Sequence, residues 1–382
     1  MNILYVYADG ENEFNCSKWN CIIPAKYVNK TNGNKANTIH INKWASNDEE
    51  ALKLTKDSDI IVVERNYFGD ILTAIQFWKV RNKTLIGIFD DAYLLMHPSN
   101  VSYDFWHNGI QPVLIKNKDG TEKTQMAKII PHPATQFKWG IQLFKGIQVP
   151  SVMLAKDWYP YNNTYYIKNY LDLEKYENVG IMHPHSDKEI LIGWHGSMSH
   201  YHSFVDSGLL DALRKIEKEY PNVKVLIGGD KRIFDELKIK NKIYQPFVSE
   251  EEFLSVINSL DIGLAPLSGE YDKRRSWIKP LEYMILKKPW IATDYITYSD
   301  LKPYGVLTEN GYSNWVKALR EVIDNIYDYK EKAQKEPYEF ALKQSSEENV
   351  KKVILPFYEK MLTEEYPIIT REGVKEYGDL SI

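Results

Sequence analysis

Four cations and one carboxylate form the part of the sequence best suited to bind a charged ligand. Lys273, Arg274 and Arg275 are consecutive, Lys279 follows them, and Glu282 comes three residues later. This density of positive charge can neutralise a polyanion, and the carboxylate shares a helical face with Lys279, where it can accept hydrogen bonds from hydroxyl groups. Among polyanions, the pattern favours a diphosphate as the ligand. A solvated basic loop with an ordinary Lys–Glu pair accounts for the same spacing equally well.

The elements around these residues would place them at the edge of a sheet. The apolar runs 262–267 and 290–293 are typical of buried parallel strands. The segment between them predicts a helix that Ser276 caps and that ends near Lys287, before Pro289. A helix start has unpaired N–H groups and a partial positive charge, so it stabilises a bound anion. Ser276 is therefore a predicted ligand-binding residue.

Two turns that contain glycine follow predicted strands. The strand expected at 189–194 leads to Gly196, Ser197 and His200, and Gly10 follows the first strand of the chain in the same way. Glycine lets a backbone approach a phosphate closely, and the neighbouring N–H groups can bind it. His200 would cap the following helix or contact the phosphate. Because ligands bind at the carboxyl ends of the strands in open α/β sheets, we expect both turns to face a ligand. A plain tight turn is the commoner explanation of a single Gly-Ser pair.

A corresponding edge in the first half of the chain has charges of both signs. The apolar runs 60–63 and 84–89 predict strands that end at Glu64 and Arg65 and at Asp91, respectively. A carboxylate at this edge can accept a proton from a substrate hydroxyl, and Arg65 can hold an anion or orient that carboxylate. These three are the predicted catalytic residues. The alternative is that Asp91 and Arg65 form a structural ion pair that supports the loops.

Several other chemistries are not favoured by the sequence. The three histidines at 195–202 lack a matching cysteine or carboxylate pattern, and the C-x4-C spacing of Cys16 and Cys21 is no usual zinc signature. We predict neither a metal site nor a cofactor. The sequence has no nucleophile elbow, Walker loop or G-x-G-x-x-G motif, which weighs against hydrolases, NTPases and dehydrogenases.

Bulk properties narrow the class of protein further. The net charge of −4 weighs against a generally basic nucleic-acid binder. Two cysteines in 382 residues suggest a reducing compartment, and the N-terminus turns acidic too early for a signal peptide. No apolar run approaches the roughly 18 residues that a membrane span needs. We therefore expect a cytoplasmic protein without a transmembrane segment.

Alternating strands and helices predict an α/β protein with two Rossmann-like domains and right-handed crossovers. We place an N-terminal domain at 1–175 and a C-terminal domain at 186–345, joined by a polar linker that contains Pro184. The apolar residues early in 346–382 recur at helical spacing, so this segment is predicted as a helix and tail that cross back to the N-terminal domain. Residues from about 96 to 133 show no regular pattern.

Two serine–glutamate pairs predict further helix starts. Ser46-x-x-Glu49 and Ser249-x-x-Glu252 both resemble capping boxes, in which each side chain hydrogen-bonds the other residue's backbone N–H.

Several of these stretches together resemble those of retaining nucleotide-sugar glycosyltransferases with the GT-B fold. The group is the glycosyltransferase family 4-like one (glycosyl transferases group 1), related to glycogen synthase and to bacterial mannosyl- and rhamnosyltransferases. The resemblance covers most of the chain, and its C-terminal motifs are fairly specific. The matching stretches are Ile192-Gly193-Trp194-His195-Gly196-Ser197-x-x-His200, Ala265-Pro266-Leu267, Arg275-Ser276-x-x-Lys279-x-x-Glu282-Tyr283, Phe89-Asp90-Asp91 and Asn169-Tyr170-Leu171-Asp172.

The resemblance implies an N-terminal acceptor-binding domain and a C-terminal domain that binds a nucleotide-diphosphate sugar, with a UDP-sugar favoured. Gly196 and Ser197 would donate backbone hydrogen bonds to the diphosphate, Arg275 and Lys279 would neutralise it, and Glu282 would bind the ribose. Transfer of the sugar to an acceptor hydroxyl would retain the anomeric configuration without a metal ion. The acceptor would be a glycan, a lipid-linked molecule or modified DNA.

Three positions depart from the family pattern. Glu64 falls near the position where many relatives have an active-site histidine. Arg274 stands where many relatives have a first glutamate, which changes the expected sugar contact. Lys287 stands where the helix usually ends in glycine, and a lysine in the left-handed conformation there costs about 1 kcal/mol.

Three other functions are compatible with the sequence. A phage-type DNA glycosyltransferase would use the Lys- and Asn-rich segments 29–43 and 117–128 to hold phosphates, although the acidic net charge weighs against it. A GT-B epimerase or hydrolase would act without an acceptor or with water. A non-catalytic sugar-nucleotide-binding subunit would explain the changes at Arg274 and Lys287, but the intact cations oppose it. Fold alone does not separate these functions.

Overall fold

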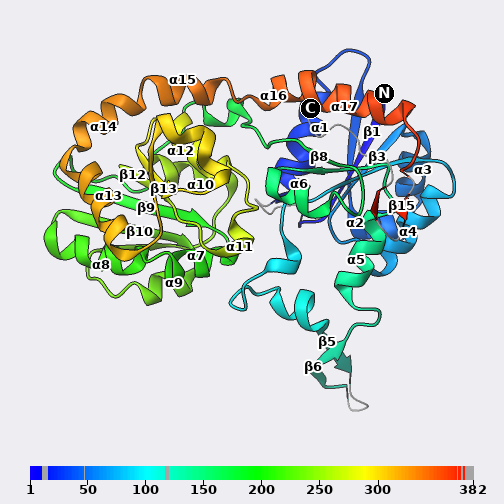
Figure 1. The fold of residues 1–382 in the computed structure, drawn as a ribbon, viewed down its shortest axis with the longest axis horizontal. Coiled ribbons are helices and arrows are strands. Elements are labelled where there is room, and N and C mark those ends of the chain that lie inside the picture. The colour runs from blue at the N-terminus through cyan, green and yellow to red at the C-terminus, as the bar shows by residue number, and fades with distance from the viewer. Residues whose placement is uncertain (11–15, 47, 117–119, 368, 371–372, 375–382) are drawn as a thin grey trace.

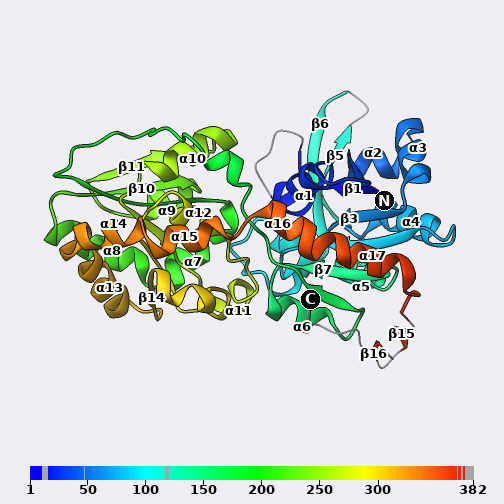
Figure 2. The same ribbon diagram turned by 90° about the horizontal axis from the view of Figure 1, so that it is seen from above.

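Two six-stranded parallel α/β domains lie side by side in the computed structural model, and a helical segment passes over both of them (Figures 1 and 2). The structure describes residues 1–10, 16–46, 48–116, 120–367, 369–370 and 373–374. The α/β class with two Rossmann-like domains, expected from the alternation of strands and helices, is confirmed. Within these ranges, no helix has both the length and the hydrophobicity needed to cross a bilayer.

The N-terminal sheet is parallel and has the order β2-β1-β3-β4-β7-β8. Its strands are β1 (Asn2–Tyr7), β2 (Lys35–His40), β3 (Ile60–Glu64), β4 (Thr84–Ile88), β7 (Gly146–Val149) and β8 (Thr164–Tyr166). The helices of this domain are α1 (Ile23–Val28), α2 (Ile41–Ala45), α3 (Glu49–Asp57), α4 (Gly69–Lys79), α5 (Pro133–Ile141) and α6 (Val152–Trp158).

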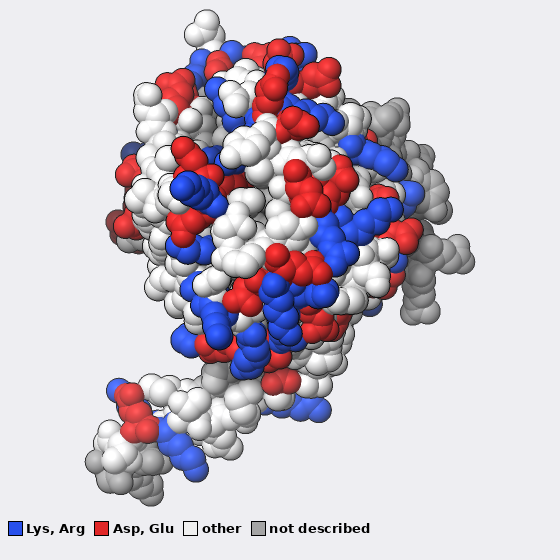
Figure 3. Space-filling model, turned by 90° about the vertical axis from the view of Figure 1, so that its left-hand side faces the viewer, with Lys and Arg blue, Asp and Glu red and all other residues white. Residues whose placement is uncertain are grey.

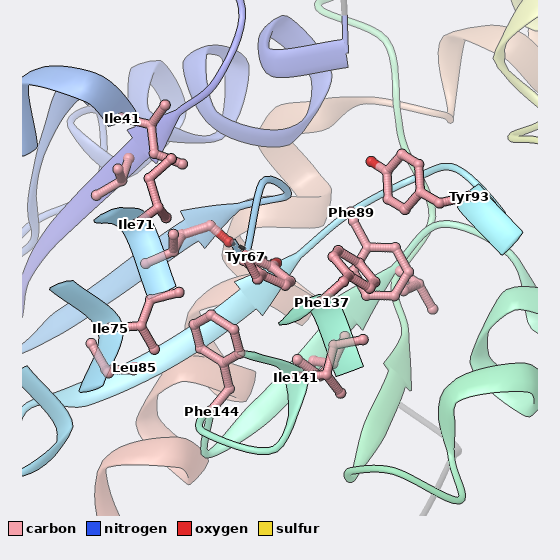
Figure 4. Packing of buried hydrophobic residues seen from close by; sticks show 14 of the residues in the cluster. Ile41, Tyr67, Ile71, Ile75, Leu85, Phe89, Tyr93, Phe137, Ile141 and Phe144 are labelled. Atoms are coloured by element: carbon pink, nitrogen blue, oxygen red, sulfur yellow. Dashed lines mark hydrogen bonds between the residues drawn. The ribbon is translucent and has the colours of Figure 1, made fainter. Parts of the chain in front are cut away.

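The central strands of this sheet are continuous apolar runs. Buried aromatic side chains pack at the carboxyl ends of β3 and β4. The four residues 60–63 of β3 are fully buried, as a parallel strand covered on both faces requires. Tyr67, just after β3, stacks on Phe137 of α5 with ring centroids 5.0 Å apart (Figure 4). The Tyr67 hydroxyl lies 2.9 Å from the carbonyl oxygen of Val63 and 3.0 Å from that of Ile88. Tyr67 therefore holds the carboxyl ends of β3 and β4 together at the points where their loops begin.

The C-terminal sheet is also parallel and has the order β11-β10-β9-β12-β13-β14. Its strands are β9 (Ile190–Gly196), β10 (Val223–Gly229), β11 (Lys242–Gln245), β12 (Ile262–Ala265), β13 (Trp290–Thr293) and β14 (Val306–Thr308). Its helices are α7 (Tyr201–Asp206), α8 (Leu209–Glu219), α9 (Lys231–Glu236), α10 (Glu250–Asn258), α11 (Gly269–Asp272), α12 (Ile278–Ile285), α13 (Tyr312–Asp324), α14 (Ile326–Ala333) and α15 (Glu336–Leu342).

The chain returns to the N-terminal domain after α15. The returning segment consists of α16 (Ser346–Asn349), a π-helical turn (Val350–Ile354) and α17 (Leu355–Thr363), followed by β15 (Ile369–Thr370) and β16 (Gly373–Val374). Phe357, Tyr358 and Met361 are buried in one apolar cluster with Ile3 and Tyr5 of β1. Figure 2 shows α16 and α17 running from one domain onto the other. The returning segment thus completes the core of the N-terminal domain.

An antiparallel hairpin projects from the N-terminal domain (Figure 1). Its strands are β5 (Ile110–Lys116) and β6 (Glu122–Lys128). The hairpin lies in the region from 96 to 133 that showed no regular pattern in the sequence. Because nearly all of its side chains are exposed on both faces, no alternation of apolar and polar residues marks these strands.

The structure confirms one predicted capping box and corrects the other. Ser249 caps α10, and Glu252 completes the box. Ser46 instead follows the end of α2, and Asp48 caps α3, because the Asp48 carboxylate accepts hydrogen bonds from the N–H groups of the first turn. Lys287 has the left-handed conformation that its position after α12 predicted, with φ of 58°.

Ser276 does not cap the helix that carries the predicted phosphate site. The helix α12 begins at Ile278 with Trp277 as the preceding residue, and the buried Ser276 hydroxyl has no hydrogen-bond partner among the described residues. Trp277 is buried, and its indole N–H donates to the carbonyl of Asn169 over 2.7 Å. This tryptophan anchors the start of the helix, which explains why the serine is not at the capping position.

Candidate active site between the two domains

A cleft of about 870 Å³ separates the carboxyl ends of the two sheets. The lining residues contributed by the N-terminal domain include Asp9, Cys16, Arg65, Asp91 and Asn100, and those of the C-terminal domain include Ser197, Ser199, Phe247, Ser249, Glu252 and Tyr271. The volume is in the range of sites that enclose small-molecule ligands. Both walls are the sheet edges at which open α/β folds bind ligands.

Arg275 is the cation that links the two walls. Its guanidinium lies 3.3 Å from the Asp91 carboxylate across the cleft, and it donates to the Ser199 hydroxyl over 2.7 Å. Its carbon centre lies 4.6 Å from the ring centroid of Tyr271, whose hydroxyl in turn donates to Asp91 over 2.7 Å. Arg275 is therefore held beside the cleft by three residues that line it.

The position of Arg275 depends on Asp272, a residue that the sequence did not single out. Asp272 is fully buried, and its carboxylate accepts hydrogen bonds from Ser203 over 2.6 Å and from the N–H of Ser268 over 2.8 Å, and lies 3.3 Å from both Arg275 and His202. Burial alone would raise the pKa of Asp272, but His202 and Arg275 hold it well below its usual range. The partners come from distant segments, so no local motif reveals this residue.

Lys279 and Glu282 lie together beneath the loop after β9. The Lys279 ammonium donates to the carbonyl of His195 over 2.7 Å, and burial lowers its pKa. Burial raises the pKa of Glu282, and Lys279 opposes that change. Neither side chain lines the 870 Å³ cleft itself. Because Lys279 donates to a neutral carbonyl rather than to a carboxylate, it can also donate to an anion bound near the loop.

The loop after β9 forms one wall of the cleft. Gly196 ends the strand, and a Cβ atom there would lie 2.4 Å from the Trp194 ring, so only glycine fits. Ser197 and Ser199 line the cleft, and their hydroxyl groups are 2.7 Å apart. His200 precedes α7 but its side chain makes no capping hydrogen bond, and burial lowers its pKa, with Arg275 adding to the effect. The predicted capping role of His200 is therefore wrong.

The charges of the N-terminal wall do not form the Asp91–Arg65 ion pair that was the alternative to a catalytic role. Arg65 forms its ion pair with Asp9, and Asp91 contacts Tyr271 and Arg275 of the other domain. Arg65 has a positive φ of 23°, which turns the chain sharply after β3. Arg65 is thus paired within its own domain, whereas Asp91 is paired with Arg275 across the cleft.

Glu64 lies behind this wall and does not line the cleft. It is fully buried, and it accepts hydrogen bonds from the Ser17 hydroxyl, from the N–H of Ala8 over 2.8 Å and from the Asn20 amide over 3.0 Å. Burial raises the pKa of Glu64 to about 7. Gly10, the other predicted residue of this wall, is exposed directly after Asp9.

Arg274 lies between the two domains and contacts both of them. Its guanidinium makes two hydrogen bonds to the Asp157 carboxylate of the N-terminal domain, over 2.7 and 3.1 Å, and its carbonyl accepts from Ser151 over 2.9 Å. Arg274 also pairs with Glu270 over 2.8 Å. The neighbouring arginines therefore separate in function, because Arg275 faces the cleft and Arg274 joins the two domains.

The structure thus brings most of the predicted site together. Arg65, Asp91 and Ser197 line the cleft, Arg275 contacts its lining, and Lys279 lies beneath one wall. No group of three or more metal-binding side chains occurs in the part of the chain that the structure describes. Sequence reasoning missed Tyr271 and Asp272, which belong to a short helix, α11, that it did not predict.

Comparison with known proteins identifies the fold of the chain but assigns it to no family. The sequence matches no protein-family model, and no protein with a curated description is similar to it in sequence. Among solved structures, sucrose-phosphate synthase from Thermosynechococcus elongatus is similar over 95% of this chain and 100% of its own, with a TM-score of 0.61 and 10% identity.

Two further solved structures were determined with sugar nucleotides or their parts. Anabaena HepE in complex with UDP and glucose is similar over 94% of this chain and 100% of its own, with a TM-score of 0.59 and 12% identity. UDP-GlcNAc 2-epimerase from Neisseria meningitidis, bound to UDP-GlcNAc, covers the same shares with a TM-score of 0.53 and 12% identity. At such low identity the likeness shows the fold alone. The chain has the GT-B fold, with two Rossmann-like domains across a central cleft.

Proposed function

We propose that the chain is a glycosyltransferase that binds a nucleotide-diphosphate sugar, with a UDP-sugar favoured, and transfers the sugar to an acceptor hydroxyl. The observation that carries this function is the pairing across the cleft: a cationic wall with Arg275 faces a wall with the Asp91 carboxylate, which lies 3.3 Å from Arg275. In the proposed complex the diphosphate takes the place of Asp91 beside Arg275.

Electrostatic stabilisation of the leaving diphosphate is the main catalytic contribution that these residues can make. Arg275 and Lys279 supply two positive charges near the loop after β9, and the backbone N–H groups at Ser197 add uncharged donors. Preorganised cations act strongly on charge that develops in a site from which water is excluded. These cations are our reason for proposing transfer without a metal ion. Retention of configuration is proposed on the family resemblance alone.

The N-terminal wall supplies the groups for the acceptor. Once the diphosphate replaces it beside Arg275, the Asp91 carboxylate is free to accept a hydrogen bond from the acceptor hydroxyl. Arg65, held by Asp9, can orient an acceptor that carries a negative charge. Glu64 lies behind this wall, so we assign it a positioning role: it holds the turn at Ala8. The acceptor itself would be a glycan, a lipid-linked molecule or modified DNA.

The first test is calorimetric titration of the protein with UDP, GDP, dTDP and CMP and with their common sugars, with and without EDTA. We expect one nucleoside diphosphate to bind and EDTA to leave the affinity unchanged. Lys279→Ala should weaken binding at least tenfold, because it removes a partly buried cation next to the diphosphate. Lys273→Ala is the matched control: this lysine is on the same loop but pairs with the exposed Glu270. No binding by any nucleotide would contradict the proposal.

Analysis of the products then distinguishes the related reactions. A glycosyltransferase releases the nucleoside diphosphate only when an acceptor is present, whereas a hydrolase releases it in water and an epimerase converts the sugar without release. Binding without any of these reactions would indicate a non-catalytic subunit. Transfer to hydroxymethylated duplex DNA would identify the phage-type enzyme; the end of the C-terminal domain in Figure 3 shows Lys and Arg interspersed with Asp and Glu rather than a basic stripe.

A further inference from the structure

The hairpin of β5 and β6 is an arm with exposed apolar side chains. It extends away from the body of the N-terminal domain (Figure 1). Leu114 is 62% exposed and Met126 is 50% exposed, and Ile115 on the opposite face is 40% exposed. An isolated two-stranded hairpin is marginally stable in water, and three or more strands are usually needed. The exposed apolar side chains and the small number of strands therefore indicate that the arm is stabilised by pairing with a further strand.

The edge formed by β6 is the one open to such a strand. β5 contains Pro112, which has no N–H to offer a neighbouring strand, and its base lies next to the helical turn Asp104–Asn108. β6 contains no proline, and all of its residues except Ala127 are exposed. A strand edge without proline can donate and accept along its whole length, and the charges of Glu122, Lys123 and Lys128 then restrict which strand can pair with it.

The sequence of β6 is complementary to itself in charge. In an antiparallel pair of two β6 strands related by a two-fold axis at Gln125, Glu122 lies opposite Lys128 of the second copy, and Lys128 lies opposite its Glu122. Thr124 lies opposite Met126 in the same pairing. This register overlaps all seven residues of the strand and places no like charges opposite each other.

We propose that two copies of this chain associate through their β6 strands and form a four-stranded antiparallel sheet. A two-fold axis makes this contact isologous, so the assembly closes as a dimer. The pairing satisfies the free backbone groups of both edges, while the two Glu–Lys pairs, which are exposed and individually weak, select the register. The association does not depend on the proposed enzymatic function, because the arm contributes no residue to the cleft lining.

Charge exchange within β6 tests this pairing by sedimentation velocity over a range of protein concentrations. The natural chain should form a dimer. Glu122→Lys and Lys128→Glu should each weaken dimerisation about tenfold or more, since each places two like-charged pairs opposite each other. An equimolar mixture of the two variants should form a heterodimer, because both pairs are then again of opposite charge. A variant with a misfolded arm would not be rescued by mixing.

Lys123→Glu is the matched control, since it makes the same chemical change on the same strand but faces Ala127 of the second copy in the proposed register. It should leave the dimer unchanged. A natural chain that stays monomeric at about 100 µM would overturn the proposal, as would a dimer that neither charge reversal weakens. A monomer that instead binds duplex DNA, more tightly in Glu122→Lys, would assign the arm to nucleic acid and equally overturn it.

Discussion

The two walls of the cleft are built on similar sheets but differ in how their charged groups are arranged. Numbered within each domain, the strand orders are 2-1-3-4-5-6 and 3-2-1-4-5-6, so the order reverses between β1 and β3 in one sheet and between β9 and β12 in the other. The loops at these reversals supply Asp9 and Arg65 on one side and Ser197 and Arg275 on the other. Topology thus decides where the cleft lies, and a few loop residues decide its charge.

The walls also differ in what holds their charged groups. On the C-terminal side a buried carboxylate, Asp272, is ionised and fixes a cation, Arg275. On the N-terminal side the buried carboxylate, Glu64, contacts uncharged donors and has a raised pKa. The comparison indicates that a buried ion pair supports the C-terminal wall, whereas neutral hydrogen bonds hold the buried carboxylate behind the N-terminal wall. The first two variants that follow test this difference, and the last two test the ion pairs that join the two domains.

Asp272→Ala should have the largest effect. It leaves Arg275 and His202 without their buried partner and the N–H of Ser268 without its acceptor, so we expect the free energy of unfolding to fall by about 3–5 kcal/mol. Urea denaturation measures this loss. Glu270→Ala, on the same short helix but exposed, should cost less than about 1 kcal/mol. Equal effects of the two variants would show that the buried charge of Asp272 does not organise the C-terminal wall.

Glu64→Gln should change how stability depends on pH. The pKa of Glu64 is about 7 in the folded chain against a reference value of 4.5, so the folded state binds more protons between these values. The free energy of unfolding should therefore fall as pH rises from about 4.5 to 7, by about 3 kcal/mol for this group. The glutamine of the variant does not titrate, and the Asn20 amide can turn its unpaired oxygen toward the new amide.

The measurement is urea denaturation of both proteins at several values between pH 5 and pH 8. The difference in unfolding free energy between them isolates Glu64, because the other buried acids titrate in both. A difference that does not change over this range would mean that Glu64 is ionised throughout, and the two walls would then be organised alike.

Much of this arrangement was predictable from the sequence, because continuous apolar runs determine the parallel strands and the ends of those strands determine the cleft. Arg275 and Lys279 were found because the cations cluster in sequence. Asp272 was not, since its partners Ser203 and His202 come from another helix and only the fold brings them together. Ser276 shows the converse: a local capping signal is overridden by the burial of its neighbour Trp277.

Arg274→Ala should have an intermediate effect, on the joint between the walls rather than on either wall. It removes two charge-assisted hydrogen bonds to Asp157 from a largely buried side chain, which contribute about 1.5–3 kcal/mol each when fully formed. Because Asp157 is partly exposed, we expect a loss near the lower value. Small-angle X-ray scattering should show a larger radius of gyration. An unchanged radius with unchanged stability would exclude Arg274 as a link between the domains.

Asp300→Ala should have the smallest effect. Asp300 also pairs across the domains, with Lys168 over 2.8 Å, but its side chain is 63% exposed. Lys168 keeps its contact with the Trp277 ring, 3.9 Å away, so we expect a loss of about 0.2–1 kcal/mol that disappears in high salt. Thermal denaturation at low and high ionic strength checks this. A loss as large as that of Arg274→Ala would mean that the solvent exposure of an interdomain ion pair does not determine how much it stabilises the fold.

The return of α17 to the first domain has a consequence for how the molecule forms on the ribosome. The face of β1 that carries Ile3 and Tyr5 is covered by Phe357, Tyr358 and Met361, which are synthesised more than three hundred residues later. The buried apolar residues that cover the C-terminal sheet, by contrast, all come from the continuous stretch 171–341. We therefore expect the domain that is translated first to be completed last, with an apolar surface that needs protection throughout elongation.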